Sequence, residues 1–105
     1  MASDKALTKA LLDAKVTAIA YETIQLEDNS LPLLRPMSEV AGRLAVANAM
    51  YFMFKTTGGS GLLMNCTPGR ERAKVTVIGG GVAGTAAANM ATSIGCGLWC
   101  YINWV

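Results

Sequence analysis

The stretch AKVTVIGGGVAGTAAANMATSIG, residues 73–95, is the most informative part of this sequence for the fold. It opens with a short β-branched run, Lys74–Ile78, which predicts a strand. Gly79–Gly84 follow with the spacing GxGxxG, and the Ala-rich residues 85–94 predict a helix. We therefore expect a strand, a tight glycine turn and a helix in immediate succession.

The three spaced glycines have separable roles in such a turn. Gly79 would permit the tight turn, Gly81 would let a pyrophosphate approach the backbone without a Cβ in the way, and Gly84 would let the helix pack onto the strand. Backbone N–H groups and the positive end of the helix would bind the phosphates. The letters alone are weak evidence, since a Gly-rich turn in an unrelated αβ unit can match them. The flanking strand and helix favour a dinucleotide site.

One expected element of an NAD site is missing. An Asp or Glu about 20 residues after the glycines normally binds the ribose hydroxyls. Residues 96–105 read CGLWCYINWV and contain no acid. The sequence thus has the glycine motif of an NAD site but lacks its acidic residue.

Composition limits what the chain can be. It has 105 residues, 9 Lys+Arg against 7 Asp+Glu, a net charge of +2 and 52% hydrophobic residues. These values argue against disorder and against nucleic-acid binding, and the length fits one domain at most. The three cysteines, without a signal-like N-terminus, predict a cytoplasmic protein. His is absent, which removes a common acid–base group and metal ligand, and we expect no metal site.

The preceding residues predict further elements. Residues 3–14 predict a helix capped by Ser3, residues 16–21 a buried strand, and residues 22–34 a strand followed by a hairpin or loop around a turn at 28–30. A second helix, capped by Ser38, should reach about Lys55, and Gly58–Gly61 is a plausible hinge. On that helix, Glu39 and Arg43 at four-residue spacing predict a solvated pair rather than a catalytic couple.

The uncharged residues 75–105 could also be weighed as a membrane span. Four glycines at the front of this run, and polar residues beyond them, favour the strand, loop and helix instead. We expect no membrane partner.

Four segments together resemble bacterial alanine dehydrogenase, with proton-translocating transhydrogenase a more distant relative. They read ALTKALLDAKVTAIAYETIQL, PLLRPMSEVAGRLAV, GGSGLL and AKVTVIGGGVAGTAA, in this order between about residues 2 and 95. The resemblance implies NAD-dependent oxidative deamination of L-alanine to pyruvate and ammonia, in a cytoplasmic homo-oligomer that is typically a hexamer. It also implies cofactor contacts, with Ser38 a direct one, at Met37, Ser38, Gly79, Gly81, Val82 and Gly84.

The departures from the family bear on activity. The Arg, Lys and His that handle the substrate in the family would precede this chain, and its ribose-binding Asp would fall near Ile102. From about Cys96 the resemblance fails, with Trp99, Tyr101 and Trp104 in place of an expected strand and acid. A shifted reading frame would produce such a loss, a hypothesis that DNA sequenced across this region would test.

The expected fold is therefore α/β: a partial Rossmann-like element, the first βαβ element of a dinucleotide-binding domain, joined by a helix to the end of an N-terminal α/β substrate domain. The expected boundaries are 1–35 for the end of the substrate domain, 36–57 for the connecting helix and 58–105 for an incomplete NAD-binding domain. We interpret the chain as an alanine dehydrogenase fragment that is inactive alone. The alternatives are an NAD(H)-binding transhydrogenase fragment and a non-catalytic interaction module.

Overall fold

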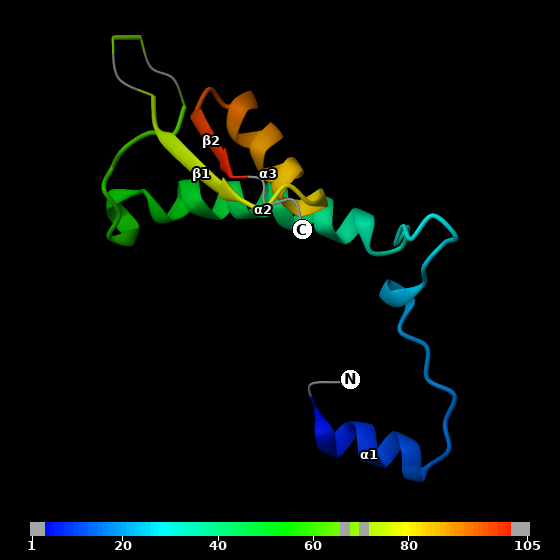
Figure 1. Cartoon of the computed structure of the whole chain (residues 1–105). Helices are drawn as coiled ribbons and strands as arrows, with labels where there is room; N and C mark the ends of the chain where they lie inside the picture. The colour runs from blue at the N-terminus through cyan, green and yellow to red at the C-terminus, as the bar shows by residue number, and fades with distance from the viewer. Residues whose placement is uncertain (1–3, 66–67, 70–71, 102–105) are drawn as a thin grey trace. The chain divides into compact units, whose positions relative to one another are not determined.

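The structure is a computed structural model that describes residues 4–65, 68–69 and 72–101. It divides into two compact units, Met1–Leu33 and Leu34–Val105. The glycine motif lies in the second unit, which holds a two-stranded sheet and two long helices (Figure 1). No helix among these described residues is long and apolar enough to span a membrane.

The second unit contains a βαβ element. Strand β1, Lys74–Ile78, leads through the glycines into helix α3, Val82–Ser93, and the chain returns as strand β2, Gly97–Tyr101. The two strands pair in parallel, with Lys74 opposite Gly97 and Ile78 opposite Tyr101. Parallel strands require a crossover connection, and α3 supplies it.

Strand β2 corrects one expectation. The second strand was expected to be missing, because the resemblance was expected to fail from about Cys96, yet residues 97–101 form one. Trp and Tyr have strand propensity, and Leu98 packs against the core. Ile102, where the family's acid would fall, and Trp104 lie outside the described residues.

Helix α2, Arg35–Phe52, begins earlier than predicted. Leu34 is its N-cap residue, Pro36 occupies the first turn, and Ser38 is already helical, its N–H donating to the Leu34 carbonyl at 3.1 Å. Ser38 is therefore not the cap, because a proline fits the first turn of a helix and extends it upstream. A 3-10 turn over Lys55–Thr57 follows α2.

The hydrophobic core lies between α2, α3 and the sheet. Its buried members are Val46 of α2, Ala91 of α3, Met64 from the loop before β1 and Cys96 from the turn before β2. Val75 and Leu98 pack against this cluster from the strands. The opposite face of the sheet is open among the described residues, since Ile78 and Trp99 are largely exposed.

The first unit contains helix α1, Lys5–Asp13. Its N-cap is Asp4, whose side chain accepts from the N–H groups of Ala6 and Leu7 at 3.0 Å each. The predicted cap Ser3 lies outside the described residues. The predicted turn at residues 28–30 forms, with the Asp28 carboxylate accepting the Ser30 N–H at 2.9 Å. Hydrogen bonds from the Ser30 side chain and from the Ser30 N–H lower the pKa of Asp28.

The strands predicted for the first unit do not form. Residues 16–20 are extended but belong to no sheet, and Tyr21–Thr23 form a 3-10 turn, η1. A strand needs a neighbour to receive its backbone hydrogen bonds, and no described residue of this unit pairs with the segment. Val16 and Ile19 are correspondingly exposed.

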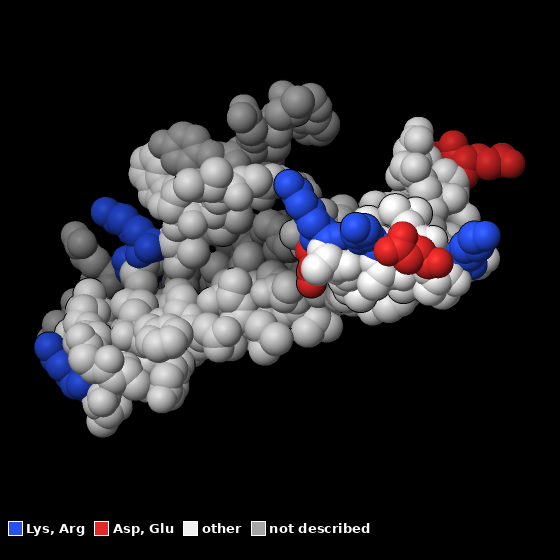
Figure 2. Space-filling view, turned by 90° about the horizontal axis from the view of Figure 1, so that it is seen from below, with Lys and Arg blue, Asp and Glu red and all other residues white. Residues whose placement is uncertain are grey.

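Much of the surface carries no charge. On the face that Figure 2 shows, uncharged atoms cover most of the area. The exposed apolar side chains include Tyr51 and Phe52 at the end of α2, and Leu62 and Leu63 in the loop that follows. The second unit, residues 34–105, contains six Lys+Arg and two Asp+Glu, so it is the cationic part of the chain.

Helices α2 and α3 meet closely at Gly42. A Cβ at this position would collide with the carbonyl oxygen of Ala83 and would lie 3.0 Å from the Ala86 Cβ. Glycine is thus required by the approach of the second helix rather than by the conformation of the first. Small residues at such a crossing let two helix backbones come together.

We expect Gly42→Ala to destabilise the fold by about 1–3 kcal/mol, because the added methyl forces the helices apart. The sign is informative, since alanine in place of glycine normally stabilises a helix by about 1 kcal/mol. Urea denaturation followed by circular dichroism measures the change. Asn48→Ala, at an exposed position of the same helix, is the control and should stabilise slightly; equal effects of the two changes would contradict the close approach.

The thiol of Cys96 is part of the core. It donates to the Met64 carbonyl at 3.0 Å, and burial raises the pKa of the Cys96 thiol. Cys100, by contrast, is exposed on β2.

The free energy of unfolding should therefore decrease as pH rises above about 8.5, the ordinary pKa of a thiol. Above that value the unfolded chain loses the Cys96 proton while the folded chain retains it, so the unfolded state gains stability. Urea titrations between pH 7 and pH 10 measure this. Cys96→Ala should remove part of the decrease and Cys100→Ala should not; the same pH dependence in both variants would contradict the assignment.

Candidate functional site

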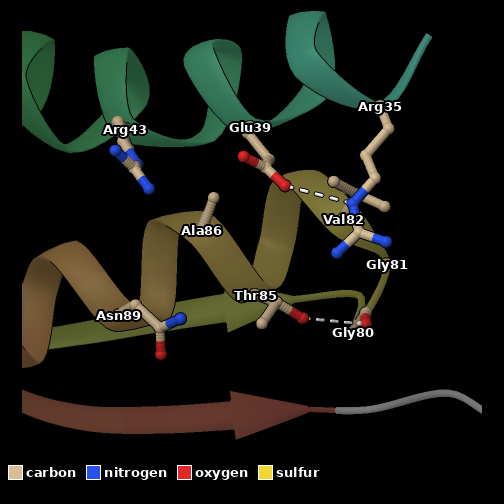
Figure 3. A pocket seen from close by; sticks show the side chains of 9 residues that line it. All are labelled: Arg35, Glu39, Arg43, Gly80, Gly81, Val82, Thr85, Ala86 and Asn89. Atoms are coloured by element: carbon tan, nitrogen blue, oxygen red, sulfur yellow. Dashed lines mark hydrogen bonds and ion pairs between the residues drawn. The ribbon is translucent and has the colours of Figure 1, made fainter. Parts of the chain in front are cut away.

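A cavity of about 480 Å³ lies where the glycine loop meets helices α2 and α3. Nine residues line it, three from α2, two from the loop and four from α3: Arg35, Glu39, Arg43, Gly80, Gly81, Val82, Thr85, Ala86 and Asn89 (Figure 3). All of them belong to the second unit. The volume is within the usual range for a small-molecule site.

The backbone of the loop matches the roles predicted for its glycines. Gly79 has a φ of +105°, which L side chains rarely adopt, so the sharp turn out of β1 needs glycine. A Cβ at Gly84 would collide with the Gly79 carbonyl oxygen and lie 3.5 Å from the Val77 side chain, so Gly84 lets α3 pack on the strand and loop. These two glycines shape the cavity without lining it.

Gly81 differs from Gly79 and Gly84 because it combines open space with an ordinary backbone conformation. It is the N-cap of α3, and a Cβ built on it would meet no atom within 4 Å. Its φ of −68° is open to any residue, so nothing within the fold explains why a side chain is absent. The space beside Gly81 fits an incoming phosphate group, held by N–H groups at the positive end of α3.

Thr85 fixes the loop to the helix. Its hydroxyl donates to the Gly80 carbonyl at 3.1 Å (Figure 3), and its N–H donates to the Gly81 carbonyl at 2.9 Å. The carbonyl oxygens of Gly80 and Gly81 thereby accept hydrogen bonds within the fold.

Helix α2 contributes charged side chains to the cavity. Arg35, Glu39 and Arg43 follow one another at four-residue spacing and point toward α3 (Figure 3). The Arg35 Nε donates to a Glu39 carboxylate oxygen at 3.2 Å. The predicted partner of Glu39 was Arg43; the carboxylate instead turns toward the N-terminus of its helix and pairs with Arg35.

Met37 and Ser38 are not among the residues that line the cavity. Both lie in the first turns of α2, Met37 exposed and Ser38 partly buried. At about 100° per residue, Ser38 is about 60° from Arg35 around the helix, whereas Met37 is on the far side. The structure thus brings Gly81 and Val82 together in the cavity. Ser38 lies outside its lining on a neighbouring face of α2, and Met37 lies on the opposite side of that helix.

Sequence reasoning missed the polar lining. The four-residue spacing of Arg35, Glu39 and Arg43 on a predicted helix could have indicated a shared face. Thr85, directly after the last glycine, could have suggested a tie to the loop. Nothing in the sequence indicates that this face of α2 meets the loop. The approach depends on Gly42, and a glycine in a sequence does not show which segment it contacts. Among the described residues, no cluster of His, Cys, Asp or Glu could hold a metal ion.

A parallel βαβ unit with a glycine turn open at Gly81 defines the class of protein, a dinucleotide-binding fold of the Rossmann type. Two family models match the chain: "Alanine dehydrogenase/PNT, C-terminal domain" over residues 45–100 and "Alanine dehydrogenase/PNT, N-terminal domain" over residues 1–41. The chain belongs to the alanine dehydrogenase/PNT family.

Individual relatives support this assignment. An alanine dehydrogenase from Methanococcus maripaludis is 52% identical over 95 residues, and alanine dehydrogenase 2 from Staphylococcus aureus is 54% identical over 95 residues. A solved L-alanine dehydrogenase structure matches with a TM-score of 0.82 and 47% identity. In each case 90% of this chain is covered. The chain spans about a quarter of the length of these proteins, 26% in each.

Proposed function

We propose that this chain contributes part of the NAD-binding site of an L-alanine dehydrogenase, an enzyme that converts L-alanine to pyruvate and ammonia. Its family membership and the names of its relatives support this function. Those names favour alanine dehydrogenase over a transhydrogenase fragment or a non-catalytic interaction module. The chain would supply the connecting helix and the first βαβ unit of the nucleotide domain.

The open space at Gly81 is the observation that carries the proposal. The residues of the loop would bind the pyrophosphate through backbone N–H groups, with Val82 beside it. The resemblance adds Ser38 and Met37 of α2 as further contacts; because Met37 lies on the opposite side of α2, it would contact a part of the cofactor outside this cavity. When bound, NAD would accept the hydride that leaves the α-carbon of alanine. The task of this chain is to hold and orient the cofactor for that transfer, since geometry contributes much of the rate in such reactions.

Catalysis needs groups that this chain does not carry. The resemblance assigns the substrate carboxylate to an Arg and a Lys, and the proton to a His, and none of these matches a position here; the chain has no His at all. A cation for the carboxylate and a base for the amine are both required for oxidative deamination. We therefore propose that the 105-residue chain binds cofactor without turning over alanine.

The purified chain mixed with L-alanine and NAD should produce no NADH, measured as absorbance at the nicotinamide band, because the proton-handling and carboxylate-binding groups are missing. A full-length relative from Staphylococcus aureus, assayed in parallel, is the positive control. Steady production of NADH by the purified chain would refute the proposal that it is inactive alone.

Titration with NADH, followed by its fluorescence, should detect binding that depends on Gly81. Gly81→Ala should weaken binding about tenfold, because an added methyl in a close contact costs about 1–3 kcal/mol. The fold should tolerate this change, since the φ is ordinary and the added Cβ meets nothing.

Gly97→Ala is the matched control for this titration. Its Cβ would make only an ordinary contact, 3.7 Å from the Ala73 carbonyl oxygen. NADH affinity should be unchanged in this variant. Equal affinity in wild type, Gly81→Ala and Gly97→Ala would argue against a pyrophosphate site at the loop.

Two finer proposals follow from the resemblance alone. We propose a cytoplasmic location and a homo-oligomeric assembly, which is typically a hexamer in this family. Light scattering of the purified chain measures its oligomeric state directly.

A further inference from the structure

The glycines account for the backbone conformation of the loop at the cavity. They do not account for the charged side chains of α2 that line it. Arg35, Glu39 and Arg43 project from α2 onto a loop whose proposed ligand is an anion. A carboxylate in such a place is unfavourable unless a cation offsets it, and Arg35 is paired with Glu39 at 3.2 Å.

The position of Arg35 follows from the helix crossing. Gly42 abuts Ala83 in the first turn of α3, so the residues one to two turns earlier on α2 lie alongside the start of α3 and its loop. Figure 3 places the Arg35 guanidinium beside Gly81 and Val82, and all three residues line one cavity. Arg43 lies further along α3, near Ala86 and Asn89 (Figure 3).

The stability of α2 does not account for Arg35. It is the first residue of the helix, where the positive end of the helix dipole disfavours a cation. Its pair with Glu39 has the weaker orientation, with the cation on the N-terminal side, and the Arg35 side chain is 70% exposed. Both effects reduce what this arginine can contribute to the helix.

The hydrogen bond to Glu39 uses the Arg35 Nε and leaves both terminal amino groups available for another acceptor. Those groups lie between α2 and Gly81 (Figure 3). The planar guanidinium suits phosphate oxygens, which it can bind through two parallel N–H groups.

We propose that Arg35 binds the pyrophosphate of the dinucleotide across the cavity from the Gly81 backbone. This inference rests on the proposed NAD site and adds to it a side chain outside the glycine motif. The pyrophosphate would then be held from two sides, by backbone N–H groups of the loop and by the guanidinium of α2.

Calorimetric titration of the full chain with NADH, ADP and adenosine tests the proposal. Arg35→Gln should raise the Kd for NADH and for ADP about tenfold, the effect of losing a charge-assisted hydrogen bond. Affinity for adenosine, which has no phosphate, should not change. Arg35→Lys keeps the charge but not the planar fork, so it should restore part of the affinity for ADP.

Two further variants separate contact from general charge. Lys9→Gln in α1 removes the same charge elsewhere and should leave every Kd within about twofold of wild type. Arg43→Gln should weaken ADP binding less than Arg35→Gln. A larger effect at Arg43 than at Arg35, or an Arg35→Gln effect equal for ADP and adenosine, would overturn the assignment.

The proposed function and this inference fail in different ways. If wild type binds neither NADH nor ADP, the dinucleotide site itself is wrong, and Arg35 has no such role. If wild type binds both ligands and Arg35→Gln binds them equally well, only the role of Arg35 is wrong. Circular dichroism of each variant checks that the helices are retained.

Discussion

The approach of α2 to α3 at Gly42 is the constraint on which the second unit depends. Because a Cβ there would strike the Ala83 carbonyl oxygen, the two helices can lie this close only with glycine at the crossing. That closeness buries Val46 against Ala91 and brings the first turns of α2 over the glycine loop. The absence of a side chain at Gly42 thus determines both how the core of the unit packs and which residues line its cavity.

The same steric principle operates within the loop, but with three different outcomes. At Gly79 the backbone conformation excludes side chains, and at Gly84 a neighbouring carbonyl oxygen excludes them. At Gly81 neither applies, so the free space is available to a ligand. Gly79 and Gly84 of the GxGxxG motif are therefore required by the fold itself. Gly81 is not required by the fold, which agrees with a phosphate-binding turn.

Several apolar surfaces of the chain are uncovered among the described residues. One face of the sheet is open, with Ile78 and Trp99 exposed, and apolar side chains at the end of α2 face solvent. In an open parallel sheet both faces are normally covered by helices. The extended residues 16–20 likewise have no partner strand among the described residues of their unit.

The sequence by itself determined the first strand, the glycine turn and the helix that follows it. The β-branched run, the glycine spacing and the Ala-rich helix are local patterns, and local sterics specify them. Non-local contacts decided the rest. Residues 16–20 have strand propensity but no partner strand among the described residues. Residues 97–101 form a strand because β1 pairs with them and Leu98 packs against the core. Glu39 pairs with Arg35 rather than with Arg43. The charged lining of the cavity depends on how α2 crosses α3. The periodicity of a helix does not predict which of its faces will meet the loop before another helix, so this lining could not be predicted from the sequence.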